Sequence, residues 1–537
     1  MKKKIQRGLC CILAMVIILT LAACGGSKTN TADAPQQSGN ASGESTVAPS
    51  KVVNVATSES IVKCDPHDQQ GWPGRAGVAM VMEPLVETDH EGNYTGLLAE
   101  SWEISEDGLT ITFHLHSGIT ASNGEVFNAD DVVATFDRIL TTDTISAHVS
   151  DWTRLVSVEK LDDLTVAFHF SEPEACAMSY FSKTFCFPDE AYAQYGDKLW
   201  LDQIMIGTGP WVWEEWVDGQ YLHLKKNENY WNKEAYDPYY EEFYMRFLTE
   251  ESSAIAAHLA GDIDAYISVG GISQDSLSLY NGTEDRIDVF SKATSLFHFI
   301  GFQCEEGTSV MSDMNLRRAF SMAIDRAAIG TSLISPDIEA SKGGLAFSFT
   351  LGYDENIDSQ YYTYNPDAAK ALVDASDYDG SEINFLIGTN VPYGENIGLL
   401  IAEYCAQVGL NVKVEMAEIA TFQDRRKAGN YDCYLTTDGI NYGELYPYMN
   451  LRLVVDVHKS HYVNEEFADL VHKAGTTVDT AARDEVYREC NAILASEVPH
   501  INLFCSPKNY AIDRDVAGIR LFSDGDFNFS RIDSGVK

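Results

Sequence analysis

Three segments of the chain have strand-forming runs on the two sides of a tight turn, with apolar and polar residues alternating after the first two turns, a pattern that predicts β-hairpins. The segments are residues 102–115, 155–170 and 211–224. Their turns fall at Asp107-Gly108, Asp162-Asp163 and Asp218-Gly219, and Asp-Gly is a preferred hairpin dipeptide. A short run of strand-forming residues at 51–56 predicts a further strand, which begins the globular region.

Between and after the hairpins, apolar residues recur at the three- and four-residue spacing of amphipathic helices. We expect helices at residues 130–140, 316–329, 366–375, 396–408 and 481–494. Asn128 is placed to cap the first of these, and Asp131 in its first turn favours the helix dipole. Strands and helices mix without a repeat of about 20–50 residues, so the pattern predicts an α/β fold with antiparallel segments and excludes a solenoid.

The start of the chain departs from this pattern, because basic residues precede an apolar run. That run, residues 9–19, is too short for a membrane span of ~20 residues and fits the core of a secretory signal. It ends in Leu21-Ala22-Ala23-Cys24, which resembles a bacterial lipobox, so we expect cleavage before Cys24 and a diacylglyceryl group on its thiol. Residues 1–23 are therefore predicted to be a lipoprotein signal peptide, and the polar residues 24–50 a flexible tether.

Composition narrows the class of protein. The chain has 537 residues, of which 45% are hydrophobic and 22% charged, as in ordinary globular proteins. Its 38 Lys and Arg against 80 Asp and Glu give a net charge of −42, which repels phosphate backbones and excludes general nucleic-acid binding. The cysteines beyond the leader form no CxxC motif, so zinc and redox motifs have no support; free thiols and one or two disulfides both remain open.

Several segments resemble the characteristic sequences of one family. Residues 96–102 with the hairpin after them, and residues 127–133, resemble the segment that typifies family 5 extracellular solute-binding proteins, the peptide and nickel receptors of ABC importers. Further matches, in chain order, are residues 206–210, 229–231, 259–265, 315–326, 364–367, 483–494 and 497–504. The resemblance spans about residues 51–520.

The resemblance implies a two-lobed α/β fold of the periplasmic-binding-protein type (type II, similar to cluster C) with an additional inserted domain. Lobe I would consist of residues 51–82, 205–297 and 503–537, the inserted domain of 83–204, and lobe II of 298–502. Two chain crossings between the lobes would form a hinge, and closure of the lobes would trap the ligand.

The resemblance also implies a lipoprotein that captures an extracellular solute, an oligopeptide or a related compound, and delivers it to an ABC permease and ATPase complex. The protein would act as a monomer at the outer face of the cytoplasmic membrane, anchored through Cys24. No catalytic residue, metal site or cofactor is expected, since the sequence has no GxSxG, HExxH or Walker motif. The alternatives are a receptor for a non-peptide solute or metal chelate, a surface sensor, and a surface hydrolase.

Three candidate ligand contacts lie before or at the start of lobe II. Glu59 follows the first strand, and Trp72 lies in the Gly- and Pro-containing segment 70–74, which predicts a loop facing the cleft. Gln303 stands where the family usually has an Asn after the crossing strand.

The remaining candidates come from the largest departure from the family pattern. Peptide receptors of this family carry an Asp that holds the α-ammonium of the peptide, and Gly443 stands near that position here. Asp438 or Glu444 would supply a carboxylate instead. The expected contacts in this segment are Asp438, Asn441, Tyr442 and Glu444. Because the Asp that holds the α-ammonium in the family is missing here, we expect this protein to bind ordinary α-peptides weakly.

Overall fold

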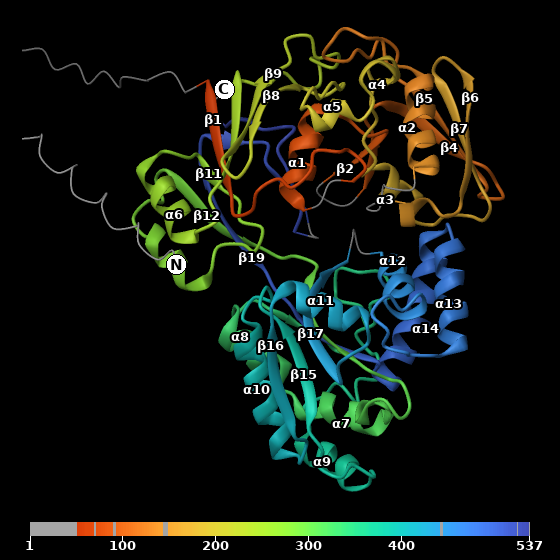
Figure 1. Ribbon diagram of the computed structural model, residues 1–537, viewed down its shortest axis with the longest axis vertical. Helices are drawn as coiled ribbons and strands as arrows, with labels where there is room; N and C mark the ends of the chain where they lie inside the picture. Colours follow the sequence, from red (N-terminus) through yellow and green to blue (C-terminus); the bar gives the residue numbers. More distant parts are fainter. Residues whose placement is uncertain are drawn as a thin grey trace, which may run out of the picture. The chain divides into compact units, whose positions relative to one another are not determined.

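Most of the strands lie in three sheets with helices around them, as Figure 1 shows. The computed structural model describes residues 51–68, 71–89, 93–142, 149–440, 444–522 and 525–535. The chain divides into two units, Met1–Ala48 and Pro49–Lys537, and all described residues belong to the second. None of the described helices is long and apolar enough to cross a membrane.

A seven-stranded sheet joins segments from both ends of the chain, in the order β12-β19-β11-β1-β10-β9-β8. Its strands are β1 (Val52–Thr57), β8 (Trp211–Val217), β9 (Tyr221–Lys226), β10 (Glu242–Phe247), β11 (Ala265–Tyr266), β12 (Ile287–Lys292) and β19 (Lys508–Asp513). β1 pairs in parallel with β10 and β11, and β8 and β9 form the predicted hairpin. Val53 and Val55 of β1 are fully buried in the same core as α1 (Trp72–Val81), which packs against β8.

A six-stranded sheet has the order β14-β18-β13-β17-β15-β16. Its strands are β13 (Leu296–Phe302), β14 (Glu339–Ala340), β15 (Ile383–Gly388), β16 (Val412–Ala417), β17 (Cys433–Gly439) and β18 (His500–Cys505). β13 is antiparallel to both β17 and β18, whereas β15 is parallel to both of its neighbours. The helices of this part are α7 (Met314–Ala323), α8 (Arg326–Leu333), α9 (Pro366–Asp374), α10 (Gly394–Gln407), α11 (Ile419–Lys427), α12 (Tyr446–Met449), α13 (Glu465–Thr476) and α14 (Thr480–Glu497).

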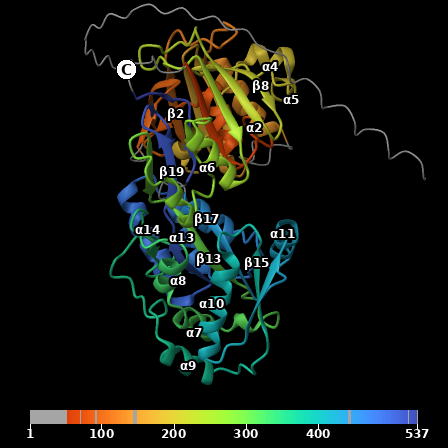
Figure 2. The ribbon, with the colours of Figure 1, turned by 90° about the vertical axis from the view of Figure 1, so that its left-hand side faces the viewer.

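The chain crosses between these two sheets twice, at neighbouring places. β12 and β13 are separated by residues 293–295, and β18 and β19 by Ser506 and Pro507. The Ser506 N–H donates to the Leu296 carbonyl (3.2 Å), and the Thr294 hydroxyl donates to the Ser506 carbonyl (2.8 Å). The two crossing segments are therefore hydrogen-bonded to each other; Figure 2 shows β13 and β19 from the side.

The third sheet is antiparallel, in the order β4-β5-β7-β6. Its strands are β4 (Ala99–Ile104), β5 (Thr110–Leu115), β6 (Leu155–Asp162) and β7 (Thr165–Phe170), and they form the other two predicted hairpins. The adjacent helix α2 (Ala129–Thr141) begins with the predicted cap. The Asp130 N–H donates to the Asn128 side chain (2.8 Å), and the Asn128 N–H donates to the Asp131 carboxylate (2.5 Å).

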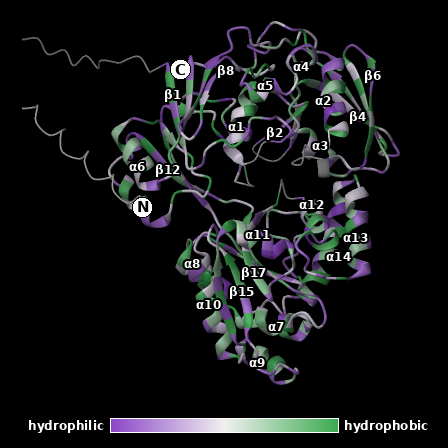
Figure 3. Ribbon diagram, in the orientation of Figure 1, coloured by the Kyte–Doolittle hydropathy of each residue, from purple (hydrophilic) through white to green (hydrophobic). Residues whose placement is uncertain are grey.

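Shorter elements connect these layers. They are β2 (Val86–Thr88), β3 (Tyr94–Gly96), α3 (Ala177–Phe181), α4 (Asp189–Tyr195), α5 (Lys198–Leu201), α6 (Glu251–Ala260), β20 (Val516–Ala517), β21 (Arg520–Leu521), β22 (Phe527–Asn528) and β23 (Asp533–Ser534). The longer helices carry apolar and polar residues together (Figure 3), in agreement with the amphipathic spacing of the sequence.

Two local predictions were wrong. The single helix expected at residues 316–329 is divided into α7 and α8, because the Asp325 side chain accepts the Ala328 N–H (2.9 Å) and caps a new helix. Trp72 is not in a loop but is the first residue of α1, where Pro73 fits because the first turn of a helix needs no N–H donor there.

One hydrophobic cluster contains residues from both the four-stranded and the six-stranded sheet regions, among them Phe168 and Tyr487. Arg154, which precedes β6, donates to Glu174 (2.8 Å) and to the Gly475 carbonyl (3.1 Å) near the end of α13. The Arg154 guanidinium also lies 5.1 Å from the Tyr446 ring centroid. We call these contacts the Arg154 bridge; they join the predicted inserted domain to the predicted lobe II.

Candidate functional site

A cavity of about 710 Å³ is lined by residues from the regions of the seven-stranded and the six-stranded sheet and from the crossing segment Ser506-Pro507. The lining residues include Glu59, Trp72 and Lys508 from the region of the first sheet, and Leu296, Asp438, Tyr448 and Arg452 from the region of the second, with Ser506 from the crossing segment. Its lining combines apolar and aromatic side chains with charged ones, as sites that bind small organic solutes do.

Four of the predicted site residues line this cavity, namely Glu59, Trp72, Asp438 and Glu444. Gln303 does not line it. Its buried amide donates to the Gly429 carbonyl (3.0 Å) and to the Lys459 carbonyl (2.9 Å), so it holds two loops to the end of β13. Asn441, Tyr442 and Cys24 lie outside the described residues.

Glu59 lies in the loop after β1, and its carboxylate accepts no hydrogen bond from the described residues. Desolvation by the surrounding protein raises the pKa of Glu59, and the positive charge of Lys508 partly opposes this shift. A cationic group of a ligand can therefore pair with Glu59 and displace no protein partner, which distinguishes Glu59 from the other predicted carboxylates.

Trp72 is held by its neighbours. The Lys508 ammonium lies 3.9 Å from the indole centroid, and Phe527 packs edge-on at 6.5 Å. Lys508 is buried and also donates to the Gly525 carbonyl at 3.3 Å. One face of the indole is thus occupied by a cation, so only the rest of the ring is available to a ligand.

Both predicted carboxylates of the second wall are paired with arginines. Arg452 donates to the Asp438 Oδ2 through Nε (3.0 Å) and Nη2 (2.8 Å). Arg483 donates to both oxygens of Glu444 (2.6 and 3.1 Å), and the Tyr487 hydroxyl adds a third bond (2.9 Å). This geometry leaves neither carboxylate free for a ligand ammonium.

Sequence reasoning missed the cations of the site, Arg452 and Lys508, and the hydroxyl of Tyr448. A signal for Arg452 was present, because it is the only charged residue in the otherwise apolar and amide stretch 445–455. It lies in the π-helical turn Asn450–Val454, an uncommon geometry that occurs often at functional sites.

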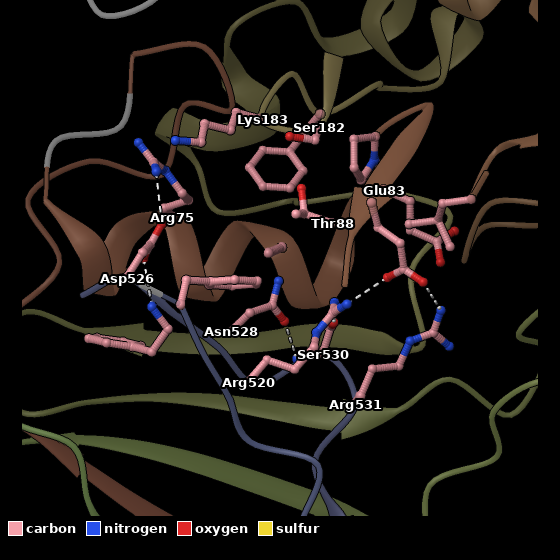
Figure 4. Close-up of a pocket in the computed structure, with 17 residues that line it drawn as sticks. Arg75, Glu83, Thr88, Ser182, Lys183, Arg520, Asp526, Asn528, Ser530 and Arg531 are labelled. Atoms are coloured by element: carbon pink, nitrogen blue, oxygen red, sulfur yellow. Dashed lines mark hydrogen bonds and ion pairs between the residues drawn. The ribbon is translucent and has the colours of Figure 1, made fainter. Parts of the chain in front are cut away.

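A second cavity of about 50 Å³ lies beside α1, and Arg75 and Lys183 line both cavities. Figure 4 shows its side chains. Its charges are paired: Arg75 bonds Asp526 (2.8 Å), and Arg520 bonds Glu87 (2.7 Å). We interpret this cluster as the anchor of α1 and β2 to the C-terminal segment.

Other groupings that resemble chemical sites have structural partners. The carboxylates of Glu125, Asp131 and Asp189 lie within 4.8 Å of one another, but Asp131 accepts two backbone N–H groups, including that of Asp189 (2.8 Å). Burial raises the pKa of Asp131 to about 7. All eight cysteines after residue 50 are free thiols, which settles the alternative left open by the sequence.

Comparison with known proteins identifies the family. The model of the bacterial extracellular solute-binding proteins, family 5 middle region, matches residues 93–454, more than half of the chain. A putative ABC transporter peptide-binding protein of Brucella ovis is 29% identical over 357 residues, which span 63% of this chain and 64% of that relative. The oligopeptide-binding protein AppA of Bacillus subtilis is 22% identical over 94% of both chains.

Solved structures share the fold. AppA from Bacillus subtilis in complex with a nonapeptide matches with a TM-score of 0.74 at 19% identity, over 90% of this chain and 98% of that chain. NikA from Brucella suis in complex with Fe(III)-EDTA matches with a TM-score of 0.78 at 20% identity, over 90% and 99%. These likenesses confirm the predicted two-lobed α/β fold and, with the family match, the interpretation as a binding protein and not an enzyme. The chain belongs to the bacterial extracellular solute-binding proteins of family 5.

Proposed function

We propose that this protein is the receptor of an ABC importer, which captures a small extracellular solute in the 710 Å³ cavity and delivers it to a membrane permease and its ATPase. The observation that carries the proposal is the lining of that cavity by residues from the regions of both large sheets and from the crossing segment Ser506-Pro507. Its volume falls within the range of about 300–1,000 Å³ that is typical of small-molecule sites.

The proposed solute is an oligopeptide or a related organic compound. The relatives support this class, since AppA is described as an oligopeptide-binding protein and a Pseudomonas aeruginosa relative as a di/tripeptide-binding protein. Other relatives are described with heme or with agropinic acid, so a non-peptide solute is the second candidate.

Lobe movement would couple capture to delivery. In this proposal residues 51–82, 205–297 and 503–537 form lobe I, 298–502 form lobe II, and 83–204 form the inserted domain. The neighbouring crossings at Thr294 and Ser506 would serve as the hinge, since few residues must change conformation there.

The test is to identify what the protein carries. The full-length protein is purified from membranes in detergent, its bound solute is released by unfolding and identified by mass spectrometry, and the solute is added back. A ligand at a hundredfold excess over Kd stabilises the folded state by about 2.7 kcal/mol, which thermal unfolding detects. Failure of every recovered solute and of a peptide panel to shift Tm contradicts the proposal.

The proposed location at the outer face of the cytoplasmic membrane has its own test. Cys24→Ser removes the thiol that would carry the acyl chains, so we expect a soluble or unprocessed protein on membrane fractionation. A processed Cys24→Ser protein that stays in the membrane fraction contradicts the lipid anchor.

A further inference from the structure

The wall formed by the six-stranded sheet region holds more positive than negative charge at one place. Arg426, in the last turn of α11, and Arg452 influence each other electrostatically, and the charge of Asp438 acts on both. Asp438 is already bonded to Arg452. This place therefore holds two guanidinium groups and one carboxylate, and that carboxylate is hydrogen-bonded to Arg452.

Arg426 is the unusual member of this group, because it is buried without an acidic partner. Only 9% of its surface is exposed, its Nη2 donates to the Gln423 side chain (2.7 Å), and its Nε has no partner among the described residues. The rings of Phe422 and Tyr434 lie 5.1 and 5.6 Å from the guanidinium carbon. Burial, with the repulsion from Arg452, lowers the pKa of Arg426.

Tyr448 adds an unused donor on the cavity side. It lines the cavity, is only 7% exposed, and its hydroxyl makes no hydrogen bond to the described residues. Burial raises the pKa of Tyr448 far above its usual range, so the hydroxyl keeps its proton. Arg452 also lines the cavity, and the described residues leave its Nη1 without an acceptor, since Asp438 takes only Nε and Nη2.

Buried charges are normally balanced by a partner, because removing an ion from water is costly. Here the two unused donors belong to side chains that line the cavity, and Arg426, which does not line it, acts electrostatically on Arg452. We propose that this wall binds an anionic group of the solute, a carboxylate or an equivalent oxyanion, which accepts hydrogen bonds from Arg452 and Tyr448 while Arg426 supplies compensating charge from behind. This inference rests on the proposed function and names one end of the solute.

The proposal reverses the polarity expected from the sequence for this wall. Asp438 and Glu444 were expected to hold an ammonium group, but their arginine partners make the wall neutral or positive. A solute with a free carboxylate and a blocked amine is therefore the better probe.

The test uses the full-length protein and N-acetyl dipeptides, prepared as a free-acid mixture and as the matching C-terminal amide mixture. We expect the acids to raise Tm and the amides to have no effect. Arg426→Met and Tyr448→Phe should each weaken acid binding about tenfold, the size expected for losing one charge-assisted interaction. Arg425→Met is the matched control: it removes a charge from the adjacent position, whose guanidinium bonds Glu415 (2.6 Å), and should leave binding unchanged.

The Tm of the ligand-free protein distinguishes a role of Arg426 in binding from a role in holding the fold. Without ligand, Arg426→Met should raise Tm, because it removes a buried charge that no carboxylate balances; a structural role would lower Tm. Equal effects of acids and amides, or equal acid binding by Arg426→Met and wild type, overturn the inference.

A further experiment does not depend on the natural solute. It compares the Tm of the protein in sodium acetate with its Tm in sodium chloride at the same ionic strength. Stabilisation of wild type by acetate that Arg426→Met abolishes supports the inference even if no natural solute is recovered. Absence of any acetate effect, together with no effect of the acid mixture, overturns it.

Discussion

At the scale of single residues, the site distinguishes carboxylates by the partners they already have. Glu59 has no hydrogen-bond donor among the described residues, whereas Asp438 and Glu444 each have an arginine. The same residue type thus has two roles in one cavity: Glu59 is available to a ligand, and the other two hold the protein together.

For Glu59→Gln we expect weaker binding of cationic solutes and unchanged binding of N-acetyl peptides. The pKa of Glu59 is raised in the folded protein, so folding favours its protonated form, and its ionisation costs stability as pH rises through that pKa. Wild type should therefore be less stable than Glu59→Gln at pH 7 and equally stable at pH 3. Thermal unfolding of both proteins at the two pH values measures the difference in Tm. A higher Tm of wild type than of Glu59→Gln at pH 7 contradicts the prediction.

Glu444→Gln should act chiefly on stability. Only 5% of the Arg483 side chain and 13% of the Glu444 side chain are exposed, and breaking such a buried pair from one side costs about 3 kcal/mol. Urea unfolding followed by tryptophan fluorescence measures the loss. A variant with wild-type stability and much weaker ligand binding would instead make Glu444 a ligand contact, as the sequence led us to expect.

At the scale of elements, the glycines of segment 206–210 show how strands and helices set the cavity wall. A Cβ on Gly207 would lie 2.2 Å from the Val81 carbonyl oxygen, and one on Gly209 would lie 2.6 Å from the Met80 oxygen. The Gly209 N–H donates to the Val81 carbonyl (2.8 Å). The glycines therefore let the chain approach the end of α1, which carries Trp72 and Arg75 at its other end.

Gly207→Ala should destabilise the protein by about 3 kcal/mol, because the clash is with backbone, which cannot rotate away. Gly270→Ala is the control, since open space surrounds that position, and it should change stability by less than about 0.5 kcal/mol. Urea unfolding compares the two. Similar stabilities would show that the segment shifts easily.

Helices and strands could be predicted from the sequence where residues close together in the chain determine them. The three hairpins follow from alternation and turn residues, and α2 follows from its cap, because each depends on residues close in sequence. The break between α7 and α8 was missed because both helices share one apolar spacing. In the site, the carboxylates were predictable from their loops, but their partners were not: Arg483 is 39 residues from Glu444, and only the tertiary fold brings the two together.

At the scale of the whole molecule, the Arg154 bridge joins two parts of the chain far apart in sequence. Arg154 bonds the Gly475 carbonyl (3.1 Å), and the Ala175 N–H bonds the same carbonyl (2.9 Å). If the predicted lobes open to release solute, these bonds must break.

Arg154→Ala should therefore speed solute release about tenfold and leave the association rate nearly unchanged. Stopped-flow fluorescence with the recovered solute measures both rates. Lys160→Ala, which removes ion pairs to Asp130 and Asp163 on the exposed side of β6, is the control. Equal release rates in the two variants contradict a role of the bridge in holding the solute.

The position of β19 has a consequence for how the protein is made. This strand fills the place between β11 and β12, yet the chain reaches it only after all the strands β13 to β18. The seven-stranded sheet stays interrupted until the C-terminal part of the chain has emerged, so the early segments cannot complete their core during translation. A nascent chain that stops before residue 508 lacks β19 and leaves β11 and β12 with open edges, which are templates for pairing with another chain.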